Sequence, residues 1–184
     1  MPSPERRQLL DSRALGRTLQ RMALDILRQT SDPSRLVLVG IQRRGVELAG
    51  RIAGLLSKET GTTVPRGALD ITLYRDDLET VGPRPLVGPT DLPMALEGQL
   101  VWIVDDVLFT GRTVRAALDE LADFGRPARI GLAVLVDRGG RELPIAADVV
   151  GEKVELEPKH RVDVFVNELD GKDAVEIAYV PRAT

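Results

Sequence analysis

The chain has 184 residues, of which 43% are hydrophobic and 29% are charged, with a formal net charge of −3. This length supports one well-buried α/β core rather than two, so we expect a single domain over residues 1–184. The negative balance argues against an overall basic surface that binds nucleic acid nonspecifically, although a local basic face is compatible with it. Cysteine is absent, which excludes disulfides and thiolate metal sites.

The sequence contains no membrane signal. No stretch approaches the roughly 20 apolar residues that a membrane span requires. The first residues, MPSPERRQLL, lack the apolar core of a secretory signal. We therefore expect a cytoplasmic protein with no membrane partner.

The first part of the chain combines helix and strand patterns. Apolar residues recur at helical spacing over residues 12–29, with Asp11 or Ser12 available as the N-cap, so we predict an amphipathic helix. The unbroken apolar run LVLVG at 36–40 is typical of a buried parallel strand. The next segment, GVELAGRIAGLL at 45–56, predicts a second helix.

The middle of the chain contains a long irregular segment between strand patterns. ALDITLY at 68–74 alternates as a strand does, whereas residues 75–93 hold four prolines and two glycines and predict a long loop. Two more buried strands are predicted for LVWIV at 100–104 and ARIGLAVLV at 128–136. A helix is predicted between them, at 113–124.

Two further strand-like runs lie near the end of the chain, VDVFV at 162–166 and AVEIAYV at 174–180, with a turn predicted over 167–172. The repeated order of strand, helix and strand predicts an α/β fold with a central, mostly parallel sheet flanked by helices. We expect the C-terminal strands, at about 148–180, to cap the ligand-binding edge of that sheet.

The segment VDDVLFTGRT at 104–113 joins two carboxylates to a small-residue turn. Asp105 and Asp106 end an apolar strand, and the ligand crevice of a parallel sheet lies at the carboxyl ends of its strands. The TGRT turn leads into a helix, whose free N–H groups favour a phosphate. Carboxylates beside a phosphate require a ligand with hydroxyls or a metal, so we predict a ribose 5-phosphate. The alternative is that the acids and the turn merely begin the next helix.

Three other features carry charge. GIQRRG at 40–45 presents Arg43 and Arg44 to an oxyanion such as pyrophosphate, and a solvated helix start explains these residues equally well. LYRDDL places Arg75 at the start of the long loop, where it reaches a ligand if that loop closes and is otherwise a charged loop residue. The single histidine, His160, lies in a charged turn and supports neither a metal site nor a Ser-His-Asp triad.

The apolar strand, the paired acids and TGRT together resemble the 5-phosphoribosyl 1-pyrophosphate (PRPP) signature of type I phosphoribosyltransferases. Three longer stretches are similar to the PyrR family, bacterial pyrimidine-operon regulators with uracil phosphoribosyltransferase activity: LDITLYRDDL at 69–78, VDDVLFTGRTVRAALDEL at 104–121 and GRPARIGLAVLVDRGGRELPIAAD at 125–148. The resemblance implies a type I phosphoribosyltransferase fold with a small hood and a flexible loop at about 74–93. It also implies that uracil and PRPP are converted to UMP and pyrophosphate.

By that resemblance the motifs divide PRPP between them. The ribose hydroxyls are held by Asp105 and Asp106, which form the implied catalytic set together with Arg44 and Arg75. The 5-phosphate is bound by the turn of Thr110, Gly111, Arg112 and Thr113. The pyrophosphate loop consists of Gln42, Arg43 and Arg44. The base is read by Val136, Asp137, Arg138 and Gly139.

Mg²⁺ bound with PRPP is the implied cofactor, and no metal-ligating residue is assigned. Breaking the bond from C1 to pyrophosphate builds positive charge on the ribose and negative charge on the leaving group, so carboxylates, arginines and Mg²⁺ stabilise opposite ends of the transition state. In purine-using relatives an aspartate usually precedes TG. Here Phe109 stands at that position, which argues against a purine substrate.

The resemblance also implies regulation through RNA and a homodimer or homotetramer. The family binds a stem-loop in the leader mRNA of its pyr operon, and uridine nucleotides such as UMP and UTP promote that binding. Arg21 and Arg141 match the basic RNA-binding surface. Other basic or polar residues typical of that surface are replaced here by Leu24, Gly140, Ala146 and Glu152. Each lost cation removes a phosphate contact, so lost or altered RNA binding is the alternative.

Overall fold

Eight strands and four α-helices lie in residues 6–74 and 89–179, the parts of the chain that the computed structural model describes. The helices are α1 (Ser12–Gln29), α2 (Arg44–Thr60), α4 (Arg112–Asp123) and α5 (Asn167–Asp170). The strands are β1 (Arg6–Leu10), β2 (Leu36–Ile41), β3 (Arg66–Leu69), β4 (Leu100–Leu108), β5 (Arg129–Asp137), β6 (Val149–Lys153), β7 (His160–Phe165) and β8 (Ala174–Tyr179). Two short 3-10 helices are η1 (Pro33–Arg35) and η2 (Ile71–Tyr74).

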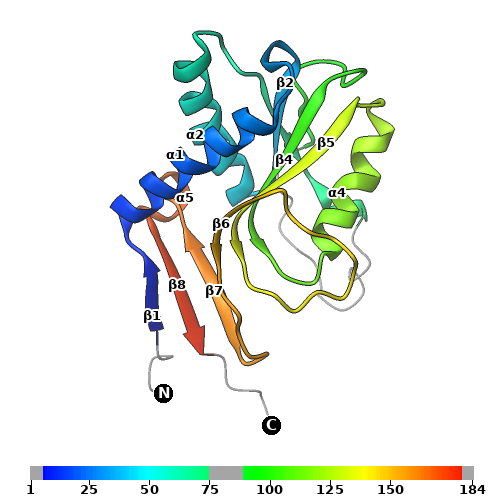
Figure 1. The fold of residues 1–184 in the computed structure, drawn as a ribbon. Helices are drawn as coiled ribbons and strands as arrows, with labels where there is room; N and C mark the ends of the chain where they lie inside the picture. Colours follow the sequence, from blue (N-terminus) through cyan, green and yellow to red (C-terminus); the bar gives the residue numbers. More distant parts are fainter. Residues whose placement is uncertain (1–5, 75–88, 180–184) are drawn as a thin grey trace.

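The central sheet has five strands, all parallel, in the order β3-β2-β4-β5-β6. Helices α1 and α2 cover one face and α4 covers the other (Figure 1). Successive residues of β4 alternate between the two cores, because side chains of a strand point to opposite faces. Trp102 packs in the core under α1 and α2, whereas Ile103 packs in the core under α4. The predicted α/β fold with a parallel sheet flanked by helices is confirmed.

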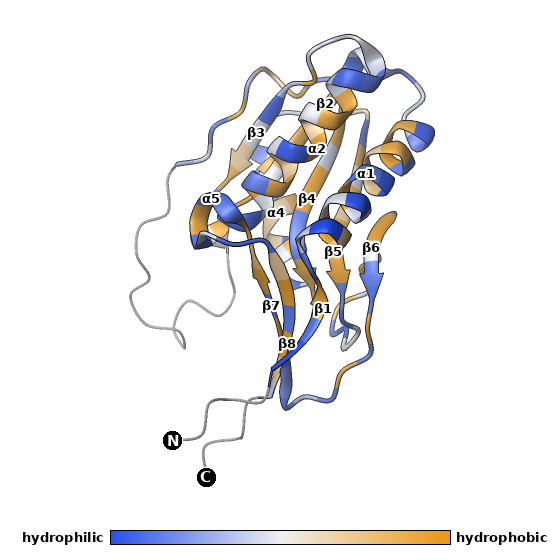
Figure 2. Ribbon diagram, turned by 90° about the vertical axis from the view of Figure 1, so that its left-hand side faces the viewer, coloured by the Kyte–Doolittle hydropathy of each residue, from blue (hydrophilic) through white to orange (hydrophobic). Residues whose placement is uncertain are grey.

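The two helices on one face are amphipathic, as their sequence patterns predict. Helix α1 begins at Ser12, and the Asp11 side chain accepts a hydrogen bond from the Ala14 N–H at 2.7 Å, which confirms the predicted N-cap. Apolar and hydrophilic residues alternate around both helices in Figure 2. Within the described residues, no helix combines the length and the apolar character needed to cross a membrane.

A second sheet of three antiparallel strands, in the order β1-β8-β7, forms the hood. Its β7 strand contacts β4, and Figure 1 shows the hood beside the end of the central sheet at which β4 and β5 finish. The hood therefore adjoins the edge of the sheet where the sequence places the ligand. The two strands predicted at 162–166 and 174–180 correspond to β7 and β8.

The strand predicted at 68–74 is wrong in its second half. Strand β3 ends at Leu69, and Ile71–Tyr74 form η2. The Asp70 side chain accepts a hydrogen bond from the Thr72 N–H at 3.0 Å, so a local turn replaces the ladder that an extended chain would make. The long loop expected after it lies largely outside the described residues, as does Arg75.

Strands β1 and β6 were not individually predicted, and α5 occupies the turn predicted at 167–172. Strand β1 carries three consecutive exposed polar residues and pairs with β8, with Arg6 opposite Ala178. Strand β6 is the edge strand beside β5 and includes Gly151 and Glu152. Both are short and lack a regular apolar pattern, so a partner distant in sequence decides their pairing.

Candidate active site

The acid pair lies at the carboxyl end of β4, as predicted, but inside the strand rather than after it. Asp105 is only 6% exposed, and Asp106 is half-buried. Each carboxylate accepts a hydrogen bond from the next backbone N–H, at 2.9 Å for Asp105 and 2.8 Å for Asp106. The two carboxylates are thus held close to the backbone at the sheet edge that faces the hood.

The β2–α2 loop packs directly against this acid pair. A Cβ on Gly45 would lie 2.5 Å from the carbonyl oxygen of Val104 and 3.3 Å from the Cα of Asp105. Only glycine therefore allows the first turn of α2 to come so close to β4. The peptide between Gln42 and Arg43 is cis. The structure thus brings the start of α2 into contact with the strand that carries the acid pair.

The arginines of this loop differ in their surroundings. Arg43 is exposed, whereas Arg44 begins α2 and reaches across to α5. The Arg44 guanidinium donates to both carboxylate oxygens of Asp170, from Nη2 at 2.8 Å and from Nε at 3.3 Å. The pairing with Asp170 was not predicted, because the two residues are far apart in the sequence.

The TGRT turn surrounds a cavity of about 300 Å³ that is lined by Val107 to Val114 and by Glu142. Gly111 adopts a φ of +94°, a left-handed conformation that favours glycine, and α4 begins immediately after it. The Thr110 carbonyl accepts the N–H groups of Glu142 at 3.0 Å and Leu143 at 3.1 Å, which hold the turn in place. The first turn of α4 thus presents backbone N–H groups at the cavity, an arrangement suited to an anion.

The segment implied to read the base follows β5. Val136 is buried, Asp137 ends the strand and Gly139 has a φ of +70°. Burial opposes ionisation of Asp137, but hydrogen bonds from the Arg141 side chain and the Gly139 N–H outweigh it, so its pKa is lowered. Asp137 therefore remains a carboxylate near neutral pH and orders the loop that follows it.

Phe109 and Arg138 form a stacked pair between the phosphate turn and the base segment. The Arg138 guanidinium carbon lies 4.0 Å from the centre of the Phe109 ring, a cation–π contact. Arg138 is 7% exposed, and its Nε has no hydrogen-bond partner among the described residues. Burial lowers the pKa of this guanidinium. Gly140 also packs against this ring, because a Cβ at that position would lie 2.5 Å from Cε2 of Phe109, and Phe109 as a whole remains 42% exposed.

Arg141 and Arg21, the two residues matched to an RNA surface, both make internal hydrogen bonds. The Arg141 guanidinium donates to the carbonyl oxygens of Phe109 at 2.7 Å and Ile145 at 2.9 Å, in addition to its ion pair with Asp137. Arg21 donates to the Val150 carbonyl at 3.2 Å and stays exposed. Arg141 therefore links the phosphate turn to the base segment, a role that its sequence position does not reveal.

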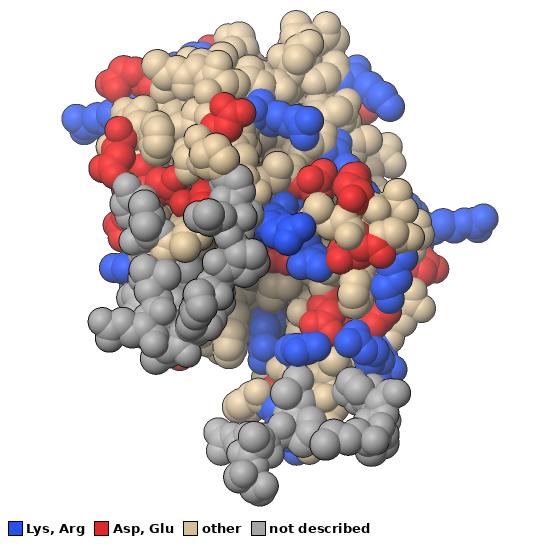
Figure 3. All heavy atoms as spheres, turned by 180° about the vertical axis from the view of Figure 1, so that it is seen from behind, with Lys and Arg blue, Asp and Glu red and all other residues tan. Residues whose placement is uncertain are grey.

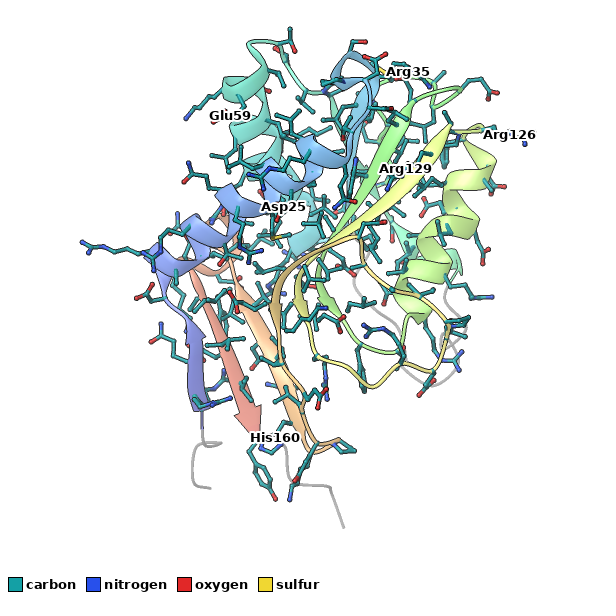
Figure 4. The ribbon with its side chains drawn as sticks, in the orientation of Figure 1. Asp25, Arg35, Glu59, Arg126, Arg129 and His160 are labelled. Carbon is teal, nitrogen blue, oxygen red and sulfur yellow. The ribbon has the colours of Figure 1, made fainter. Side chains whose placement is uncertain are left out.

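The described residues offer neither a protein-built metal site nor a histidine beside the acid pair. Among residues 6–74 and 89–179, no three His, Cys, Asp or Glu side chains form a group that could hold a metal ion. His160 lies at the beginning of β7, at the lower end of the hood in Figure 4, and its ring meets the Tyr179 ring edge-on at 5.6 Å. Arg35, Arg126 and Arg129 lie at the other end of the molecule in the same view.

Comparison with known proteins identifies the family. The sequence matches the phosphoribosyl transferase domain over residues 5–169. It is 51% identical over 173 residues to the bifunctional protein PyrR of Pelotomaculum thermopropionicum, covering 94% of this chain and 96% of that protein. For the bifunctional protein PyrR of Chloroflexus aurantiacus, the identity is 55% over 171 residues, covering 93% and 94%. This chain belongs to the PyrR family of phosphoribosyltransferases.

Solved structures show the fold of this PyrR family member. A hypoxanthine-guanine phosphoribosyltransferase from Bacillus anthracis superposes with a TM-score of 0.70 at 19% identity, covering 95% of this chain and 98% of the other. The hypoxanthine phosphoribosyl transferase of Trypanosoma cruzi gives a TM-score of 0.70 at 18% identity, covering 98% and 93%. At these identities the likeness establishes the type I phosphoribosyltransferase fold of this chain and does not extend to its substrate.

Proposed function

We propose that this chain is a uracil phosphoribosyltransferase that converts uracil and PRPP to UMP and pyrophosphate. The observation that carries the proposal is the succession, along β4 and into α4, of a carboxylate pair and an anion cradle. A ribose 5-phosphate needs both, because its hydroxyls donate to carboxylates and its phosphate accepts from helix N–H groups. Membership of the PyrR family supports the same substrate.

In this proposal Asp105 and Asp106 accept hydrogen bonds from the ribose hydroxyls, and Thr110 to Thr113 hold the 5-phosphate. The carboxylates also stabilise the positive charge that develops on the ribose as its bond to pyrophosphate breaks. Negative charge develops on the leaving pyrophosphate, and this group is bound by the loop of Gln42, Arg43 and Arg44. Arg75, which lies outside the described residues, is proposed to bind the same group. The proximity of Gly45 to Asp105 supports this division, because it brings the two charge-stabilising groups together.

Magnesium fits the donor set at this edge. Mg²⁺ keeps several waters and usually takes one or two carboxylates together with substrate phosphates, and Asp105 and Asp106 are carboxylates of that kind. When bound with PRPP, the ion neutralises charge on the departing pyrophosphate. Asp105 and Asp106 would help to hold the ion together with the pyrophosphate, in addition to the roles proposed for them above.

For the base, we propose that Val136, Asp137, Arg138 and Gly139 read uracil. The carboxylate usual in purine-using relatives is replaced by Phe109, whose ring is covered on one side by Arg138. That replacement supports a pyrimidine and argues against a purine.

The test compares three bases in parallel. The protein is incubated with Mg²⁺, PRPP and either uracil, hypoxanthine or adenine, and nucleotide formation is followed by chromatography. We expect UMP with uracil and little or no nucleotide with either purine. Absence of UMP under conditions where the protein is folded would remove the enzymatic assignment.

We also propose regulation of a pyrimidine operon by binding of its pyr leader mRNA, dependent on uridine nucleotides such as UMP or UTP. Arg21 and Arg141 would contribute to the RNA surface, although both make internal hydrogen bonds. Glu152 and the uncharged Leu24, Gly140 and Ala146 favour the alternative of an enzyme with lost or altered RNA binding. Basic and acidic side chains lie side by side on the rear face in Figure 3.

Titration of the leader RNA separates these two readings. If regulation is retained, we expect UMP to strengthen binding to the leader and not to a scrambled RNA of equal length. Equal, weak binding to both RNAs with and without UMP supports the altered enzyme. We also propose a single domain over residues 1–184 and a cytoplasmic location. The proposed assembly is a homodimer or homotetramer, and sedimentation measures which of the two forms in solution.

A further inference from the structure

An acidic segment between β7 and β8 is ion-paired to the first half of α2. Asp170, at the end of α5, pairs with Arg44. Two further carboxylates of the segment pair with Arg51, Glu168 at 2.6 Å and Asp173 at 2.7 Å. In Figures 1 and 2, α5 lies beside the end of α2 at which that helix begins. The segment between two hood strands is thus ion-paired to helix α2, which follows β2.

The Arg44 contact uses only one edge of its guanidinium. Asp170 accepts from Nε and Nη2, which form the side edge of the planar fork. A guanidinium carries five N–H donors, so Nη1 and the second hydrogen of Nη2 make no bond to Asp170. The Arg44 side chain is 36% exposed in this position, so a second oxyanion can reach it.

Asp170 is itself held in place by its own segment. Its Oδ2 accepts the Val166 N–H at 2.9 Å, in addition to the bond from Arg44. Burial opposes its ionisation, yet the hydrogen bonds from Arg44 and Val166 outweigh that effect and lower its pKa. Arg44 is therefore held by a charged group whose own orientation is fixed.

We infer that Asp170 is a positioning residue for pyrophosphate binding: it fixes the side edge of the Arg44 guanidinium and leaves the other edge for the pyrophosphate group of PRPP. The inference rests on the proposed function, in which Arg44 binds pyrophosphate. Arginine has a long, flexible side chain, and ordering it before the ligand arrives removes a cost that binding would otherwise carry. Asp170 acts through Arg44 and needs no contact with substrate.

The same contact between Asp170 and Arg44 could instead hinder pyrophosphate binding, and the experiment distinguishes these two roles of Asp170. If pyrophosphate had to displace Asp170 from Arg44, the carboxylate would act as an internal competitor. Removing its charge would then tighten binding of PRPP and pyrophosphate. Positioning predicts the reverse.

The test measures KM for PRPP, kcat, and the affinity for magnesium pyrophosphate by calorimetry. Asp170→Asn keeps the size of the side chain and an oxygen to accept the Val166 N–H, but it loses the charge and one of the two acceptors for Arg44. We expect KM and the pyrophosphate Kd to rise about fivefold or more, with a much smaller change in kcat, because a charge-assisted fork is lost. An unchanged or lower KM overturns the inference.

A matched control comes from the same segment. Glu168→Gln breaks one ion pair to α2, but it leaves the Arg44 pair intact and leaves Asp173 bound to Arg51. We expect its KM and pyrophosphate affinity to match the wild type. An equal loss in both variants would mean that general attachment of the hood matters, and the specific role of Asp170 would fall.

The double variant separates this inference from the proposed function. In an Arg44→Ala background, we expect Asp170→Asn to cause no further loss of pyrophosphate affinity, because its effect passes through Arg44. If Arg44→Ala weakens pyrophosphate binding and Asp170→Asn does not, only the positioning role is wrong. If Arg44→Ala has no effect, the pyrophosphate role of Arg44 is wrong as well.

Arg44→Lys gives a second route if Asp170→Asn does not fold. Lysine keeps the positive charge but lacks the planar fork that pairs with Asp170, so we expect the KM for PRPP of Arg44→Lys to rise.

Discussion

Neighbouring residues in this site have different surroundings although they are chemically alike. Asp105 is buried beside Gly45 in the first turn of α2, whereas Asp106, one residue further, is half-buried. Each carboxylate accepts a hydrogen bond from the backbone N–H of the residue that follows it. The pair is therefore held near the end of β4 with one carboxyl group buried and the other partly open to solvent.

The acid pair provides the first prediction. Replacing both residues, Asp105→Asn with Asp106→Asn, keeps side-chain oxygens that can accept the two backbone hydrogen bonds, so the fold should survive. Transfer should fall by at least about 100-fold, because the negative charge facing the developing positive charge is gone. Circular dichroism and initial rates of UMP formation measure the two effects. A folded double variant with near-normal activity would contradict the assignment.

Arg141 provides a second prediction at the residue scale. Its guanidinium bonds Asp137 and the carbonyls of Phe109 and Ile145, so Arg141→Met should destabilise the protein by about 2–3 kcal/mol at pH 7. The folded-state pKa of Asp137 is lowered, so its charge adds to the free energy of unfolding at pH values above its unfolded pKa of about 4. This contribution to stability is lost as the pH falls through the folded pKa.

Urea denaturation of the wild type and Arg141→Met between about pH 7 and pH 3 checks this sign. The difference in free energy of unfolding should narrow as the pH falls below the unfolded pKa of about 4 and toward the lower folded pKa of Asp137. A difference that stays constant across that range would mean that the Asp137 charge contributes nothing to the linkage.

Helix α4 contributes at both of its ends. Its first turn borders the cavity at the TGRT turn, and further along Glu120 is only 3% exposed. The hydroxyl of Thr90 donates to Oε1 of Glu120 and accepts the Asp70 N–H at 3.0 Å. Oε2 of Glu120 has no hydrogen-bond partner among the described residues. One helix thus links the phosphate turn to the chain on both sides of residues 75–88.

Glu120→Gln tests that buried carboxyl group. Burial raises the pKa of Glu120, and the nearby charges of Asp70 and Asp123 raise it further, while the bond from Thr90 opposes them. Because the folded pKa of Glu120 lies above its unfolded pKa, near 4.5, this group adds to the free energy of unfolding at pH values below the unfolded pKa. That contribution to stability is lost as the pH rises through the folded pKa. The uncharged variant should therefore be more stable than the wild type at pH 8, by about 1 kcal/mol.

Thermal unfolding at pH 8 and at about pH 4.5 measures the effect. The advantage of Glu120→Gln should shrink at the lower pH, because a raised pKa favours the neutral form of the buried wild-type carboxyl group there. A variant that is less stable at pH 8 would show that the charged form is accommodated, contrary to the expectation from its burial.

At the scale of the whole molecule, the site joins segments from most of the chain. The loop after β2, the end of β4 and the start of α4 come together near the hood, and α5 is attached to α2 by ion pairs. A ligand that contacts all these segments binds the folded state alone. Ligand binding and global stability should therefore be coupled.

Calorimetric melting with PRPP and Mg²⁺ tests this coupling. Ligand at 100 times its Kd should add about 2.7 kcal/mol to the free energy of unfolding, and the melting temperature should rise with ligand concentration. PRPP without Mg²⁺ should stabilise less, and ribose 5-phosphate should retain part of the effect through the TGRT cavity. No shift with any of these ligands would place the site elsewhere.

Local patterns in the sequence were sufficient to predict the parallel α/β core, the position of the acid pair near the end of β4 and the glycine turn before α4. Each of these depends on periodicity or on residues adjacent in the chain. Pairing of β1 with β8, the Arg44–Asp170 ion pair and the Arg141 hydrogen bonds were decided only by the tertiary structure. Their partners lie far apart along the chain or depend on how a loop folds back. Backbone patterns predict which elements form, whereas the directions in which long charged side chains reach depend on what packing places beside them.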